Sequence, residues 1–191
     1  MFYDLQYLSE QVAANDSGAL VGDPFELMDS ICVTEKHIDS LIHERIERVD
    51  TCEHHIEFAA IVLGKGNTIP VGACARSATI YVYLFLRRIP IHSPVFDWMV
   101  DTVQQDFERT EASIRHIYPP VLLFWILFVA GTASLGKPQR SWFRSKLAKY
   151  RGFLKLNSWK AAKEVLETLV WLDTPGESLG GSLWEELEGL R

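Results

Sequence analysis

Hydrophobic residues recur with the period of an α-helix along most of the chain. The first such stripe, at the i, i+3 and i+4 spacing of one helix face, is Phe2, Leu5, Leu8 and Val12. Sustained alternation of apolar and polar residues, which marks a half-buried β-strand, does not occur. The pattern therefore predicts an all-α fold, a single domain over residues 1–191 with about eight to ten helices.

Start signals and breaks divide the remaining sequence into further helices. Asp23 followed by Pro24 is typical of a helix N-terminus, and the apolar stripe behind it extends to about Val49. Ser158 is a second predicted N-cap. Further helices are expected over residues 52–63, 70–88, 95–114, 121–136, 142–155 and 159–172. The glycine-rich sequence TPGESLGG, residues 174–181, is predicted to form a turn before a short terminal helix.

Two runs are apolar enough to form helices buried on all sides. They cover residues 71–86 and 119–136. Arg76 interrupts the first run, and the second has fewer apolar residues than the roughly 20 that a membrane span requires. We therefore expect these two helices at the centre of a soluble protein, with amphipathic helices packed around them and no membrane association.

Composition and charge narrow the classes of function. The chain carries a formal net charge of −6 at pH 7, whereas a nucleic-acid-binding domain is usually basic. Its three cysteines are scattered and include no CxxC pair, which favours reduced thiols in the nucleus or cytoplasm over a secreted disulfide framework. The first residues lack the basic and apolar segments of a secretory signal.

One segment departs from this acidic balance: residues 137–155 contain seven Lys and Arg and no Asp or Glu. On a helical projection its apolar side chains form one wide face, made of Trp142, Phe143, Leu147, Tyr150, Phe153 and Leu154. Arg144, Arg151 and Lys155 lie on one flank of this face. The arrangement favours a packed helix whose cations line the edge of the core. Docking of an anion or a partner is the second interpretation. Direct nucleic-acid contact is disfavoured because no helix-turn-helix or zinc-finger motif accompanies the segment.

Motifs for catalysis, metal binding or phosphate binding do not emerge. The CEHHIE sequence, residues 52–57, suggests a metal site, but the HExxH spacing that places two imidazoles on one helix face is absent. A structural zinc ion requires four converging ligands, so we predict no metal. GxSxG, GxGxxG and P-loop patterns are absent too. The sequence therefore assigns no catalytic residue and implies no cofactor.

The C-terminal third resembles a known family. Its sequences LLFWILFVAGTASLGKPQRSWFRSKLAKY, LNSWKAAKEVLETLVWLD and SLWEEL are similar to the C-terminal part of the fungal-specific transcription factor domain. The resemblance covers residues 55–190, strongly over residues 119–190 and weakly before about residue 50, and ACARSATIYVYLFLRRIP is similar to the mid-region helix of that domain. It implies an all-helical regulatory region of the kind that follows a binuclear zinc cluster in fungal regulators. That cluster needs six cysteines, so this chain is not expected to bind DNA specifically by itself.

Two functions follow from the resemblance. In the first, the chain is a regulatory or effector domain that binds a small molecule or a protein partner, or forms a homodimer, as a piece of a larger regulator or as a free-standing member. In the alternative, a stand-alone member has been recruited to a secondary-metabolite pathway. It would serve there as a binding protein or as a cofactor-free enzyme of the cyclase or isomerase type, with an apolar pocket.

An apolar ligand would bind where the two hydrophobic helices meet. The expected lining is Tyr81, Tyr83, Trp98 and Trp125. Trp98 belongs to the apolar stripe predicted for residues 95–114, which is Val95, Trp98, Met99, Val103 and Phe107. Arg76 is the expected polar anchor, because a charge within an apolar helix is costly unless it is paired or functional. The alternative for Arg76 is an ion pair with an acidic side chain such as Glu57 or Asp97.

Overall fold

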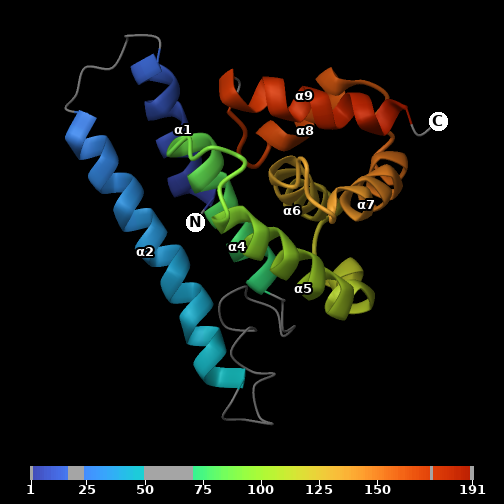
Figure 1. Ribbon diagram of the computed structural model, residues 1–191, viewed down its shortest axis with the longest axis horizontal. Coiled ribbons are helices and arrows are strands. Elements are labelled where there is room, and N and C mark those ends of the chain that lie inside the picture. The colour runs from blue at the N-terminus through green and yellow to red at the C-terminus, as the bar shows by residue number, and fades with distance from the viewer. Residues whose placement is uncertain (1, 17–23, 50–70, 173, 190–191) are drawn as a thin grey trace.

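The computed structural model describes residues 2–16, 24–49, 71–172 and 174–189, and these form helices and connecting segments with no β-strand (Figure 1). The elements are α1 (Phe2–Asp16), α2 (Pro24–Val49), α4 (Val71–Tyr81), the π-helical turn η1 (Val82–Leu86), α5 (Val95–Ile117), α6 (Pro120–Ala133), α7 (Arg140–Phe153), α8 (Trp159–Glu167) and α9 (Thr174–Glu188). The all-α prediction is therefore confirmed. The helix predicted over residues 52–63 and the cap at Asp23 lie outside the described residues.

Helices α1 and α2 cover one side of the molecule, and α2 runs along its edge (Figure 1). The stripe predicted for α1 is confirmed, because Leu5 and Leu8 are at most 1% exposed and Val12 is buried. Helix α2 contacts α1 and α4, and its Ile31 and Ile38 are buried. Helix α2 is continuous through Val33 and Thr34, two adjacent β-branched residues near its centre.

The two apolar runs form α4 and α6, which contact each other and are surrounded by other helices. Residues 123–133 of α6 are all buried, so no face of this part of the helix reaches solvent. Helix α4 contacts α2 and α5 as well as α6. Its regular hydrogen bonding changes after Tyr81 to a π-helical turn, in which the Arg87 amide donates to the Val82 carbonyl at 2.8 Å. The single helix predicted to reach Arg88 therefore ends earlier than expected.

Helix α5 corrects one detail of the predicted apolar stripe. Its fully buried side chains are Phe96, Val100, Val103 and Phe107. Trp98 is 60% exposed, because it lies about 140° from Val103 around the helix axis. The stripe therefore passes through Phe96 and Val100, and the prediction that Trp98 faces the core is wrong.

The C-terminal helices both confirm and correct the expected boundaries. Ser158 caps α8 as predicted, since its hydroxyl oxygen accepts a hydrogen bond from the Ala161 amide at 3.2 Å. The predicted glycine-rich turn is wrong, because α9 already begins at Thr174 and includes Gly180 and Gly181. A Cβ on Gly180 would lie within 3.0 Å of the rings of Trp159 and Trp171. Glycine at this position serves close helix packing rather than a turn.

None of the helices in the described part of the chain is long and apolar enough to cross a membrane.

Candidate functional site: the basic helix α7

Helix α7 carries the basic segment and packs against α6 and α9. Phe143 and Leu147 are fully buried, and Tyr150 is 7% exposed, which confirms the predicted packing face of this helix. The close approach to α6 occurs at Gly131, where a Cβ would meet Leu147 at 3.2 Å and Phe143 at 3.5 Å. Phe153 was expected to widen this face, but it is 71% exposed. The apolar face is therefore narrower at the C-terminal end than the projection predicts.

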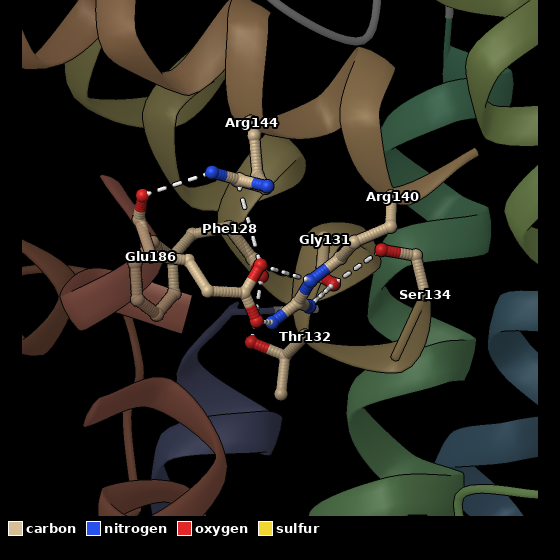
Figure 2. A network of polar contacts seen from close by, with 7 residues as sticks. All are labelled: Phe128, Gly131, Thr132, Ser134, Arg140, Arg144 and Glu186. Carbon is tan, nitrogen blue, oxygen red and sulfur yellow. Dashed lines mark hydrogen bonds and ion pairs between the residues drawn. The ribbon is translucent and has the colours of Figure 1, made fainter. Parts of the chain in front are cut away.

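Arg140 joins three helices at the start of α7, as Figure 2 shows. Its guanidinium donates to both carboxylate oxygens of Glu186 on α9, through Nη2 at 2.7 Å and Nε at 3.2 Å. Its Nη1 donates to the Gly131 carbonyl near the C-terminus of α6, which also accepts from the Ser134 hydroxyl at 2.6 Å. A cation at a helix C-terminus satisfies orphan carbonyls and complements the helix dipole. We call this Arg140–Glu186–Gly131 arrangement the arginine clamp.

Glu186 also receives Arg144. The Arg144 Nη2 donates to the Glu186 backbone carbonyl at 3.1 Å, and its Nε lies 3.4 Å from the carboxylate (Figure 2). The hydrogen bond from Arg140 is the largest influence on this carboxyl group, and it holds the pKa of Glu186 below its usual value of 4.5. The carboxylate is thus the acceptor on which two cations of the basic segment converge.

Other cations of the segment pair with acidic residues of α5. Lys146 contacts Glu111, and Lys137 contacts Asp97. Among the described residues, five of the seven cations make ion pairs within the chain: Lys137, Arg140, Arg144, Lys146 and Arg151. Lys149 and Lys155 are exposed. Most of the positive charge in the segment is therefore compensated by the fold.

A hollow lies where the C-terminal ends of α7 and α9 meet. It has a volume of about 720 Å³ and is lined by Ala148, Arg151, Gly152, Lys155, Leu156, Asn157 and Leu187. Arg151 lines it and is 9% exposed: Nε donates to the Leu156 carbonyl at 3.2 Å and Nη1 donates to the Leu187 carbonyl at 3.0 Å. The guanidinium carbon lies 4.7 Å from the centroid of the Trp184 ring. We call this feature the C-terminal hollow.

Lys155 adopts a backbone conformation that is uncommon for its residue type. Its φ is +55°, in the left-handed region. The Leu156 amide donates to the Arg151 carbonyl at 3.0 Å and the Lys155 amide donates to the Gly152 carbonyl at 3.2 Å. These two bonds form the Schellman motif that ends many helices, and the left-handed position in that motif is usually glycine. The chain therefore keeps a lysine at the edge of the hollow where glycine would be favoured.

The structure places two of the predicted ligand-binding residues, Tyr81 and Trp125, together in the core. Both are 0% exposed, and their ring centroids are 6.0 Å apart. The Trp125 indole donates to the Val170 carbonyl at 2.8 Å. The Tyr81 hydroxyl lies 2.9 Å from the Ser9 hydroxyl, which itself donates to the Leu5 carbonyl, so Tyr81 is the donor of this bond. Burial raises the pKa of Tyr81. These polar atoms are satisfied within the fold.

The other three predicted residues lie apart from that pair. Arg76 forms an ion pair with Asp106 of α5 at 2.8 Å, so it has an acidic partner, but a different one from those expected. Its guanidinium carbon lies 5.8 Å from the centroid of the exposed Trp98 ring. Tyr83 is half-buried and faces the Glu35 carboxylate of α2. The pKa of Tyr83 is raised, and burial of its side chain is the largest cause. Ligand binding by these residues stays a prediction.

Sequence reasoning missed the lining of the C-terminal hollow. Apart from Arg151 and Lys155, which were assigned to the edge of the core, its residues carry no motif, and Leu187 comes from a different helix. One sequence signal pointed to this region: the end of α7 reads GFLKLN, residues 152–157, with Lys155 where a glycine cap would be typical.

Metal-binding and thiol groups add little to this site. No group of three or more His, Cys, Asp or Glu that could hold a metal ion occurs within residues 2–16, 24–49, 71–172 and 174–189. The CEHHIE sequence lies outside the described residues. Cys74 is a free and buried thiol, and burial raises its pKa to about 12. A thiol with this pKa is unreactive at neutral pH.

Comparison with known proteins identifies the family of this chain. The model of the family described as fungal specific transcription factor domain matches residues 20–188. The match includes α7 and α9 with the arginine clamp and the hollow. It confirms the resemblance found over residues 119–190 and extends it toward the N-terminus. No curated protein and no solved structure gives a match.

Proposed function

Because the chain belongs to the fungal specific transcription factor domain family, we propose that it is a regulatory domain that acts in the nucleus. It controls transcription by binding a protein partner or a small molecule, and it does not read DNA sequence itself. The observation that carries this proposal is the family match over residues 20–188, which covers most of the chain.

The ion pairs and the buried face of α7 support the proposal that the chain does not read DNA sequence itself. A helix that reads DNA needs a free face with side chains able to reach base edges. The packing face of α7 is buried against α6, and most of its cations are engaged with acidic side chains of α5 and α9. Phosphate groups would have to compete with these ion pairs, and the formal net charge of −6 opposes approach of a polyanion.

A tethering experiment tests the regulatory role. The chain is placed between a heterologous DNA-binding domain and an activation domain in a yeast reporter strain, and the output is compared with that of the fusion without it. We expect the chain to change reporter output and Arg140→Ala to abolish that change, because the variant breaks the arginine clamp. Lys149→Ala is the matched control, since this exposed lysine of the same helix lies outside the clamp. Reporter output that is the same with and without the chain would refute the regulatory role.

DNA binding is measured directly by fluorescence anisotropy with a labelled random duplex. At physiological salt we expect affinity no tighter than the weak end of non-specific binding, a Kd of about 100 μM or more. A sub-micromolar Kd that depends on Arg144 or Lys149 would show that the helix binds DNA directly, and would contradict this part of the proposal.

A further inference from the structure

We propose that the C-terminal hollow binds a short acidic segment of a partner protein, which places an apolar side chain between α7 and α9 and carboxylates beside Lys155 and Arg151. The inference rests on the proposed regulatory function and names the surface and the partner chemistry through which it acts. Three observations carry it: the charge of the lining, the conformation of Lys155 and the open shape of the hollow.

The charged groups at the hollow are mainly positive. Lys155 is exposed at its edge. Arg151 in its lining is held by two backbone carbonyls and the Trp184 ring, so its guanidinium is fixed in place before any ligand arrives. One acidic group lies near Arg151: a carboxylate oxygen of Glu188 is 4.0 Å from Arg151 Nη2, and the Glu188 side chain is 45% exposed. This ion pair is longer than a hydrogen bond, so an incoming carboxylate would share Arg151 Nη2 with Glu188.

Among the described residues other than glycine, Lys155 and Arg88 have a positive φ. A residue other than glycine in the left-handed region costs roughly 1–2 kcal/mol, and this position of the Schellman motif is usually glycine. Strained backbone of this kind often occurs at functional sites, where the side chain offsets its cost by binding. Lys155 lines the hollow with an exposed side chain, so its strained backbone carries a cation at this site.

The shape of the hollow favours a peptide over a small molecule. Sites for small molecules enclose about 70–90% of the ligand surface, whereas this hollow is a shallow depression that is widely open to solvent. Its apolar walls are Ala148, Leu156 and Leu187. A Cβ on Gly152 would meet no atom within 4 Å, so the glycine leaves space for a side chain from outside. An apolar side chain in this space, flanked by acidic neighbours, matches both the walls and the cations.

Fluorescence anisotropy on the purified full chain tests the proposal. The probes are short fluorescein-labelled peptides in which Asp alternates with Leu, Phe or Trp. We expect saturable binding by at least one of them, weakened by added salt because the charges are exposed. The same peptide with Asn in place of Asp should bind at least about tenfold more weakly, as should the one with Ala in place of the apolar residues. Absence of binding by all three acidic peptides would overturn the proposal.

Two pairs of variants locate the binding. Gly152→Leu fills the hollow, and we expect it to weaken binding about tenfold or more. Its matched control is Gly181→Leu, a helical glycine on α9 that also has open space around it. Lys155→Gly removes the ammonium and should weaken binding by about threefold, whereas Lys149→Ala should leave it unchanged. Circular dichroism of each variant shows that the helices are retained.

Other outcomes contradict the proposal. Equal binding by Gly152→Leu and the wild type would place the peptide elsewhere. Displacement of the peptide by a simple dicarboxylate such as glutarate, at the same concentration as unlabelled peptide, would make the hollow a small-acid site instead. The tethered reporter separates the two hypotheses. Peptide binding without any effect on the reporter would refute only the regulatory function. An effect on the reporter without peptide binding would refute only this inference.

Discussion

At the scale of single residues, charged side chains of this protein link helix ends to one another. Arg140 satisfies a carbonyl at the end of α6 and a carboxylate on α9, and Arg151 satisfies the Leu187 carbonyl at the end of α9. Each guanidinium therefore fixes the relative position of two or more helices. Arginine suits this role because its planar fork of donors remains charged and can reach several acceptors at once.

Glu186→Gln should make this linkage visible as a dependence of stability on pH. The folded pKa of Glu186 lies below its usual value of 4.5, so the carboxylate stabilises the fold above pH 4.5 and loses this contribution as the pH falls through the folded pKa. At pH 7 we expect the variant to be less stable by up to about 1 kcal/mol, a small value because the Glu186 side chain is 34% exposed.

Urea denaturation of wild type and Glu186→Gln at several pH values measures this effect. The difference in unfolding free energy between the two proteins should narrow as the pH falls below 4.5. A difference that is constant over this range would mean that the carboxylate charge contributes nothing to the clamp.

Lys155→Gly should stabilise the protein while it weakens the proposed peptide binding. Glycine adopts the left-handed conformation without steric cost, so we expect a gain of about 0.5–1 kcal/mol in unfolding free energy. Lys155→Ala keeps the backbone cost and removes the charge, and it should show no comparable gain. Thermal melting of the two variants distinguishes strain from charge, and a less stable Lys155→Gly protein would contradict the assignment of strain.

At the scale of helices, Gly180 and Gly181 test why α9 packs closely. A Cβ on Gly180 would lie 2.8 Å from Trp171, 2.9 Å from Trp159 and 3.3 Å from Phe128, all ring atoms. Gly180→Ala should therefore cost about 1–3 kcal/mol of stability through overpacking. Gly181→Ala on the same helix has open space and should be neutral, or stabilising by up to about 1 kcal/mol. Equal effects of the two substitutions in a melting experiment would argue against the close contact.

These glycines also show which elements the sequence predicts poorly. Helices with a clear apolar stripe, such as α1, and helices with a side-chain cap, such as α8 at Ser158, are predicted correctly. Two glycines in one short stretch normally indicate a turn, and only the tryptophan rings of other segments explain why Gly180 stands inside α9. That information is tertiary, so a local pattern cannot supply it.

The candidate site was harder to predict for the same reason. The packed face of α7 follows from periodicity, since Phe143 and Leu147 are buried as expected. The acceptor of Arg140 could not be found from the sequence, because Glu186 is 46 residues away on another helix. Arg76 could be predicted in part. Its need for an acidic partner follows from the apolar residues around it in the sequence, but the choice of Asp106 depends on how α4 and α5 are aligned.

At the scale of the whole molecule, one aromatic side chain connects segments from both ends of the chain. The Trp125 ring lies 5.1 Å from Phe2 of α1 and 6.0 Å from Tyr81 of α4, measured between ring centroids. Its indole also donates to the Val170 carbonyl that follows α8. Buried residues from α1 to α9 belong to the same hydrophobic core. The N-terminal and C-terminal helices should therefore unfold together rather than as separate units.

Trp125→Phe tests this cooperativity. The change removes one buried hydrogen bond and leaves a small cavity, so we expect a loss of about 2 kcal/mol in unfolding free energy. Far-UV circular dichroism follows all helices, whereas tryptophan fluorescence is dominated by residues of the C-terminal half, among them Trp159, Trp171 and Trp184. In a two-state transition the two signals coincide, and the substitution should shift both midpoints equally. If only the fluorescence midpoint moved, Trp125 would stabilise the C-terminal helices alone, and the regulatory surface on α7 would be independent of the N-terminal helices.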